Sequence, residues 1–171
     1  MRVTSGTLGR LGQIAVGLLL VAMPVVAETP AVARAPEAEA IGKVLDEFIE
    51  ALNTADLQRY VALFTPDATA FFPLSEVPLR LENKEQITAV FGTFFEGVRR
   101  GNPGPRYMNL APADLKLQRY GDAAIVTFHL KGGTMISRRT LVLVKREGKW
   151  MIVHLHASSL EAGAPRAAIQ R

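Results

Sequence analysis

Hydrophobic residues recur at two different periods along the chain. In the first part they fall three or four positions apart, the spacing of one helix face. Asn83, with Gln86 three positions later, is typical of a helix start. Asp56 is expected to cap a shorter helix, and Asp67 to lie in the turn that ends it. This pattern predicts helices over residues 37–52, 57–64 and 84–100.

The second half of the chain alternates hydrophobic and polar residues with a period of two, the pattern of half-buried strands. It predicts strands over residues 107–120, 123–131, 135–146 and 149–159, with a shorter one at 68–72. The first of these is expected to be broken near Ala111 and Pro112. Helices followed by an antiparallel meander form an α+β fold, in which the helices cover one face of a curved sheet.

Residues 1–27 have the layout of a secretory signal peptide, with a basic start and a 13-residue apolar run. The run is shorter than the roughly 20 residues that span a bilayer. Cleavage after Ala27 is expected, with Ala31, Ala33 or an uncleaved anchor as alternatives. We therefore expect an exported protein, periplasmic or secreted, without a stable membrane anchor. Its mature parts are a flexible linker (28–36), one domain (37–160) and a C-terminal tail (161–171).

Composition narrows the chemistry further. The 171 residues are 49% hydrophobic and include no cysteine, which excludes disulfides, thiolate catalysis and Cys-ligated metal centres. The net charge of +4 falls to +2 without residues 1–27, and the remaining basic residues form no stripe interleaved with aromatics. Nucleic acid is therefore not an expected partner.

Two stretches resemble a known superfamily. The first, ALNTADLQRYVALFTPDATAFFP (residues 51–73), resembles the NTF2-like group, which includes ketosteroid isomerase, scytalone dehydratase and SnoaL-like polyketide cyclases. The second, KREGKWMIVHLHASS (145–159), is similar to the association (hub) domain of calcium/calmodulin-dependent protein kinase II and its small bacterial relatives. The resemblance covers residues 40–159. It implies a cystatin-like cone of three N-terminal helices on a curved, mainly antiparallel sheet, and self-association as a homodimer or higher oligomer.

The resemblance lets isomerase chemistry be tested residue by residue. Ketosteroid isomerase needs a carboxylate base and acidic hydrogen-bond donors. The matching positions hold Phe48, Phe72 and, for the second donor, Thr140 or Leu141. None of these side chains replaces the acid or the base, so no catalytic residue and no cofactor is assigned. The alternative is a SnoaL-like cyclase, isomerase or dehydratase with an unrecognised polar set such as Tyr60, Arg139 and His129.

A mainly apolar pocket is the expected binding site. Hub domains carry cavity arginines and a histidine, which the resemblance places at Leu130, Leu141 and Ile87 here. Arg139 shares the parity of Leu141 and is either the polar group of the cavity or a solvated strand-end charge. The predicted lining is Phe48, Phe64, Phe72, Ile87, Phe91, Phe128, Leu130, Arg139, Leu141, Val153 and Leu155. Such an interior either holds a small apolar ligand or is simply a filled core.

All three histidines have the opposite strand parity, which predicts a mixed polar and aromatic sheet face. Its expected members are His129, Thr140, Trp150, His154, His156 and Ser158. Zinc is conceivable there, because histidines two apart on a strand point the same way. We favour a contact with a second copy of the chain, since mixed faces are common in homo-oligomers. No metal site is therefore assigned.

Overall fold

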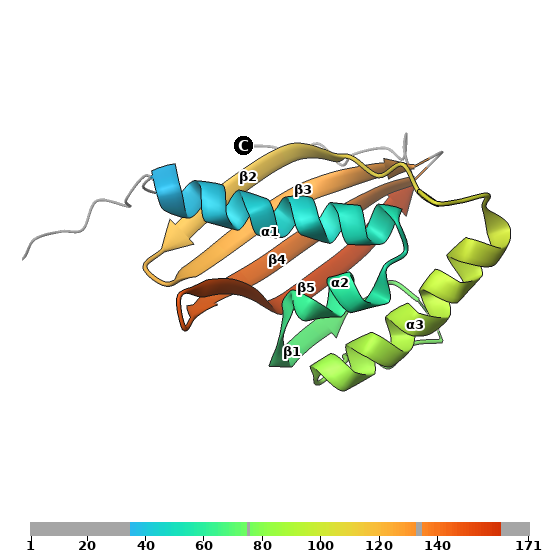
Figure 1. Cartoon of the computed structure of the whole chain (residues 1–171), viewed down its shortest axis with the longest axis horizontal. Coiled ribbons are helices and arrows are strands. Elements are labelled where there is room, and N and C mark those ends of the chain that lie inside the picture. The colour runs from blue at the N-terminus through green and yellow to red at the C-terminus, as the bar shows by residue number, and fades with distance from the viewer. Residues whose placement is uncertain (1–34, 75, 133–134, 162–171) are drawn as a thin grey trace, which may run out of the picture.

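The computed structural model describes residues 35–74, 76–132 and 135–161. Within them, three helices lie against one face of a curved five-stranded sheet (Figure 1). The helices are α1 (Ala35–Asn53), α2 (Leu57–Ala62) and α3 (Lys84–Gly101). The strands are β1 (Phe64–Phe71), β2 (Pro112–Tyr120), β3 (Ala123–Gly132), β4 (Met135–Arg146) and β5 (Lys149–Glu161). The expected signal peptide, nearly all of the linker and the tail from residue 162 lie outside the described residues.

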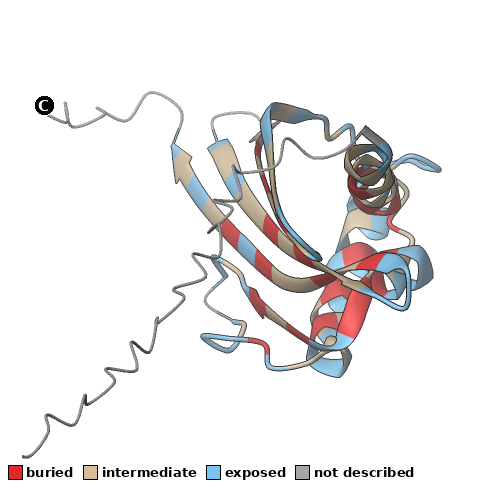
Figure 2. Ribbon diagram, turned by 90° about the vertical axis from the view of Figure 1, so that its left-hand side faces the viewer, coloured by how far each residue is buried: buried red, intermediate tan, exposed pale blue. Residues whose placement is uncertain are grey.

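The sheet has the order β1-β5-β4-β3-β2. Strands β2 to β5 form the predicted antiparallel meander, and β1 adds to its edge parallel to β5. The α+β fold class is confirmed. Buried residues gather between the sheet and the helices, as the burial colours of Figure 2 show.

Local capping fixes the start of two helices. The Asn83 side chain accepts a hydrogen bond from the Gln86 backbone N–H over 2.9 Å, and Asp56 accepts one from the Arg59 N–H over 3.0 Å. Each bond satisfies a backbone donor that the first helical turn leaves free. Both predicted caps are therefore confirmed. The first helix starts at Ala35 rather than Glu37 and so includes the last two residues of the expected linker.

The predicted turn at Asp67 is wrong. Strand β1 starts at Phe64 and includes Asp67, whose carboxylate accepts two hydrogen bonds of 3.0 Å from the Arg146 guanidinium. The backbone N–H of Ile152 also donates to the Leu63 carbonyl over 2.8 Å. Pairing with β5 therefore extends the strand through Pro66. Proline has no backbone N–H, so it disfavours a strand only where that N–H is needed for a hydrogen bond to the neighbouring strand.

A β-bulge in β5 places the residues before it on the face of the sheet opposite to the one predicted from the alternation of the sequence. The register with β4 shifts between Val142 and Leu143, so that Val142 pairs with His154 and Leu143 pairs with Ile152. Val153 is the extra residue, and such an insertion exchanges the two faces on its N-terminal side. Trp150 consequently lies in the core with 6% of its surface exposed, and its placement on the histidine face was wrong. Val153 is half-buried at the bulge rather than in the pocket.

Candidate functional site

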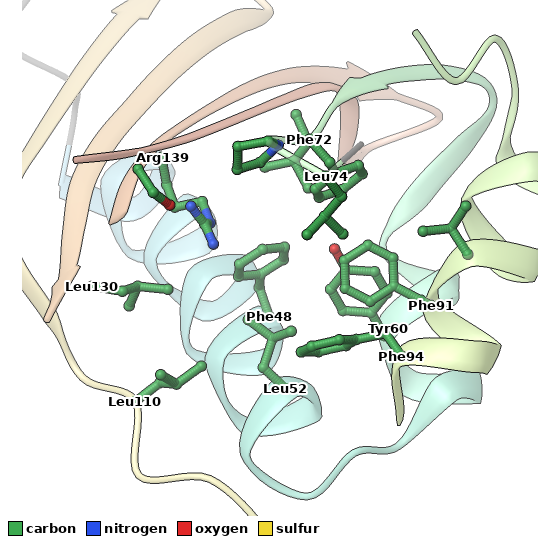
Figure 3. Close-up of a pocket in the computed structure, with 14 residues that line it drawn as sticks. Phe48, Leu52, Tyr60, Phe72, Leu74, Phe91, Phe94, Leu110, Leu130 and Arg139 are labelled. Atoms are coloured by element: carbon green, nitrogen blue, oxygen red, sulfur yellow. The ribbon is translucent and has the colours of Figure 1, made fainter. Parts of the chain in front are cut away.

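A cavity of about 200 Å³ lies between the helices and the inner face of the sheet (Figure 3). Helices α1, α2 and α3, the segment after β1, the segment before β2, and strands β3, β4 and β5 each contribute to its wall. The lining is almost entirely apolar. It consists of Phe48, Leu52, Tyr60, Phe72, Pro73, Leu74, Val90, Phe91, Phe94, Leu110, Leu130, Arg139, Leu155 and Ser159.

Six of the predicted lining residues lie on this cavity: Phe48, Phe72, Phe91, Leu130, Arg139 and Leu155. Four others are fully buried in the core and line no part of it: Phe64, Ile87, Phe128 and Leu141. The interior is thus a packed core in one part and a cavity in another. Parity identifies inward-facing residues, but it does not separate these two parts.

Several lining residues escaped the sequence reasoning. Pro73, Leu74 and Leu110 lie in segments between elements, where no period shows which side faces inward. Tyr60, on the six-residue helix α2, was expected only as part of the polar set of a possible enzyme and not in the lining. Phe94 was detectable, because it follows Phe91 at helical spacing.

Two polar side chains approach each other from different elements. Figure 3 shows the Arg139 guanidinium, from β4, and the Tyr60 hydroxyl, from α2, on either side of the Phe48 ring. Among the described residues, hydrogen bonds of the guanidinium involve only Nη1, which donates to Ser137 Oγ and to the Arg138 carbonyl. The Tyr60 side chain is 0% exposed and its hydroxyl has no hydrogen-bond partner among these residues.

Burial governs the ionisation of both groups. It raises the pKa of the Tyr60 phenol well above its ordinary value, and the charge of Arg139 opposes this only in part. The hydroxyl therefore stays protonated and able to donate. Burial also lowers the pKa of Arg139 from its ordinary value, but an arginine keeps its charge at neutral pH. The cavity thus holds one cation, Arg139, and two neutral hydroxyl groups, those of Tyr60 and Ser159.

A second, shallower hollow of about 220 Å³ adjoins the cavity. The two share Phe94, Leu110, Leu130, Arg139 and Ser159, and the hollow adds Met108, Met135 and Ser137. Arg139 therefore lies where the interior cavity meets the more open hollow. Exposed apolar side chains surround this entrance, notably Leu74, Phe94 and Met135.

The remaining predicted polar residues lie on the outer face of the sheet. Register pairs join Thr140 to His156 and Arg138 to Ser158, and these four residues line a shallow surface hollow. His154 Nδ1 and Thr69 Oγ1 share a hydrogen bond of 2.8 Å. Burial, then His156 and Arg80, lower the pKa of His154 from its ordinary value.

The outer face does not gather the three histidines. His129 pairs with Arg138 on β4, so a whole strand separates it from β5. Its Nδ1–H donates to Asp114 Oδ2 over 2.9 Å, a carboxylate partner that sequence reasoning missed because a bulge in β2 brings it there. No group of three potential metal ligands is found in the described part of the chain. Nor is any helix there long and apolar enough to cross a membrane.

A SnoaL-like domain model matches residues 41–162, which is most of the chain. The chain belongs to the SnoaL-like domain family. Solved structures similar to this SnoaL-like domain include an NTF2-like protein and a protein with a cystatin-like fold, and these likenesses confirm the expected cystatin-like fold.

One curated relative of this SnoaL-like domain is the delta subunit of calcium/calmodulin-dependent protein kinase type II from Oryctolagus cuniculus. It is 29% identical over 136 residues, or 75% of this chain and 24% of the kinase subunit. The chain therefore spans about a quarter of that relative's length.

Two solved structures extend the comparison. The S. rosetta CaMKII hub is 26% identical, with a TM-score of 0.55 over 71% of this chain and 95% of the hub. A ketosteroid isomerase-like protein from Erwinia carotovora atroseptica SCRI1043 is 20% identical, with a TM-score of 0.61 over 75% of this chain and 99% of that one. The second likeness concerns the fold alone.

Proposed function

We propose that this SnoaL-like chain is an exported, self-associating binding module that holds a small, mainly apolar ligand in its cavity. The apolar lining of the cavity carries the proposal, because a concave apolar site with few polar groups is the usual form of a small-molecule site. The acid and base positions of ketosteroid isomerase are taken by Phe48 and Phe72, which both line the cavity.

Saturation-transfer NMR with toluene and indole, two neutral apolar probes, tests the binding function. Val90→Trp fills the cavity from α3, whereas Thr93→Trp adds the same ring to an exposed position of that helix. We expect saturation transfer to both probes in the wild type and in Thr93→Trp, and its loss in Val90→Trp. Equal transfer in all three proteins, or none in the wild type, would refute a ligand-binding cavity.

The outer sheet face is the proposed contact with a second copy. It combines partly buried apolar side chains, such as Val142 and Met151, with the polar residues around His156. Similarity to a protein described as a hub supports self-association. We expect light scattering to give at least the mass of a dimer, and His156→Glu to lower it. Thr93→Glu, on α3, is the matched control, and a monomeric wild type would contradict the assignment.

Export rests on residues 1–27 and is tested separately. We expect the mature protein recovered from a bacterial host to start at Glu28, as read by N-terminal sequencing. A cytoplasmic protein that keeps Met1 would contradict export without bearing on the cavity.

The alternative function is a SnoaL-like enzyme, which the likeness to a ketosteroid isomerase-like protein keeps open. Of the three polar residues proposed for it, Tyr60 and Arg139 line the cavity, but His129 lies on the outer face beside Asp114. Without an imidazole or carboxylate in the lining, we expect no isomerisation of a β,γ-unsaturated ketone above the buffer rate. A saturable rate abolished by Tyr60→Phe would favour the enzyme.

A further inference from the structure

We infer that the shallow hollow on the outer face of the sheet binds a tetrahedral oxyanion, either a free phosphate or sulfate ion or the phosphate group of a monoester. This site goes beyond the proposed function, because it needs neither the apolar cavity nor a ligand in it. Four side chains line the hollow, and all four can donate hydrogen bonds to an anion: Arg138, Thr140, His156 and Ser158.

The hollow arises from the register of the last two strands. Arg138 lies opposite Ser158, and Thr140 lies opposite His156, so the four residues form a block on neighbouring strands. Opposed residues on such strands stand about 5 Å apart, and the next pair on the same face lies about 7 Å further along. The two long side chains, Arg138 and His156, occupy one diagonal of the block. The short hydroxyl side chains occupy the other diagonal, which leaves space between the long ones.

The donors around this space are not used within the described protein. In residues 35–74, 76–132 and 135–161, these four side chains make no hydrogen bond or ion pair with one another or with other groups. His129, the register partner of Arg138 on β3, instead holds the carboxylate of Asp114 over 2.9 Å. No acidic side chain among those ranges lines the hollow. An incoming anion therefore meets a guanidinium and further donors, without a carboxylate in the wall to repel it.

The His156 ring is oriented by an aromatic neighbour. Its centroid lies 5.7 Å from that of Phe71, with the two ring planes at 62°. Phe71 makes a similar edge contact with His154, whose Nδ1 shares a hydrogen bond with Thr69 Oγ1. An imidazole carries at least one N–H donor in either protonation state. Because its ring is already packed, His156 loses little side-chain freedom when it donates to a bound anion.

The number of donors and the openness of the hollow indicate the kind of anion. A carboxylate has two oxygens, whereas phosphate and sulfate present three or four in a tetrahedral arrangement that donors on several sides can reach. Arginine binds phosphate oxygens in a bidentate geometry. The volume of about 310 Å³ is roughly ten times the share of one water in the liquid, about 30 Å³. A doubly charged anion can therefore bind here and keep part of its hydration, which an enclosed apolar site would remove.

Such a site is compatible with the proposed contact through the same face. A second copy that covers the outer face would remove the exposed guanidinium of Arg138 from water, at a cost in free energy. An oxyanion enclosed in the hollow balances that charge. Binding of the anion and contact between two copies therefore favour each other.

Two-dimensional ¹⁵N NMR of the purified protein tests the site. Inorganic phosphate is titrated at constant ionic strength against sodium chloride, because screening by salt alone also changes the spectrum. We expect saturable shifts at the amides of Thr140, His156 and Ser158. Arg138→Met should weaken phosphate binding at least about 10-fold, through loss of hydrogen bonds from a charged donor. Arg100→Met, which removes an exposed arginine from α3, is the matched control and should leave the binding unchanged.

A second pair of variants tests the geometry at constant charge. Ser158→Ala removes a hydroxyl from the hollow and should weaken binding several-fold, whereas Ser159→Ala alters the wall of the inner cavity and should not. Phenyl phosphate distinguishes the two sources of the oxyanion: tighter binding than inorganic phosphate assigns the hollow to a monoester, and weaker binding assigns it to the free ion. Shifts that do not saturate, or that are the same in Arg138→Met as in the wild type, would overturn the inference and leave the apolar cavity intact.

Discussion

The indole Nε1–H of Trp150 donates a hydrogen bond of 2.8 Å to Oε2 of Glu37 and thereby joins the last strand to the first helix. The other carboxylate oxygen accepts from Lys145 Nζ over 2.7 Å. These two bonds, that from Lys145 first, lower the pKa of Glu37 from its ordinary value. One carboxylate on α1 is thus bonded to both β4 and β5, and it holds the helix against these two strands.

Trp150→Phe should lower the midpoint of thermal unfolding by a few degrees. The substitution keeps most of the buried aromatic surface but removes the donor to Glu37. Circular dichroism melting checks this, with Tyr107→Phe as a control that removes a polar group from an aromatic ring outside this contact. An unchanged midpoint would mean that the bond contributes nothing to stability.

Asp67→Asn should make stability less dependent on pH in the acidic range. The Arg146 guanidinium, followed by Thr65, lowers the pKa of Asp67 to about 2 from 3.8. A carboxyl with a depressed pKa stabilises the fold above its unfolded pKa, and this contribution is lost as pH falls from about 4 through 2. The pair is exposed, so a loss of only about 2 °C in melting midpoint is expected at pH 7.

The wild type and Asp67→Asn should therefore converge as pH is lowered to 2. Thermal melts at pH 7, 4 and 2 measure the convergence, with Glu147→Gln, in the adjacent turn, as the matched charge-removal control. A constant difference at all three pH values would contradict ionic stabilisation by Asp67.

Phe95→Ala and Phe94→Ala should differ sharply in cost although the residues are adjacent. Phe95 is 0% exposed within the core, whereas Phe94 is 41% exposed at the cavity entrance. We expect Phe95→Ala to reduce the free energy of unfolding by about 3–5 kcal/mol and Phe94→Ala by less than about 1.5 kcal/mol. Urea denaturation measures both, and equal costs would mean that the two rings are packed alike.

Asn53→Ala should loosen the cavity wall at Leu110. The buried Asn53 side chain donates from Nδ2 to the Leu110 carbonyl over 3.0 Å and accepts from the Leu110 N–H over 2.7 Å. Its loss leaves two backbone groups without these bonds, at an expected cost of about 1–3 kcal/mol. Hydrogen exchange at Leu110 should accelerate, whereas Asn102→Ala, at the exposed end of α3, should leave it unchanged. Unaltered exchange in Asn53→Ala would show that other contacts hold this segment.

Local chemistry was sufficient to predict most elements. The caps at Asp56 and Asn83 are read from neighbours three positions away, and β4 spans the predicted residues from Met135 to Arg146. The alternation of apolar and polar residues along the strands also placed Leu130 and Leu155 on the inner face. Such features depend on residues close together in the chain, so the sequence alone reveals them.

The candidate site depended on contacts between distant segments. The bulge at Val153 moved Trp150 into the core, and no local signal marks a bulge in an otherwise alternating strand. The meeting of Tyr60 and Arg139 around Phe48 joins two helices to a strand far along the chain. The sequence by itself determined the helices, the strands and the SnoaL-like resemblance. Only the tertiary structure decided which inward-facing residues pack together and which leave a cavity, because packing is settled by the volumes of all the side chains at once.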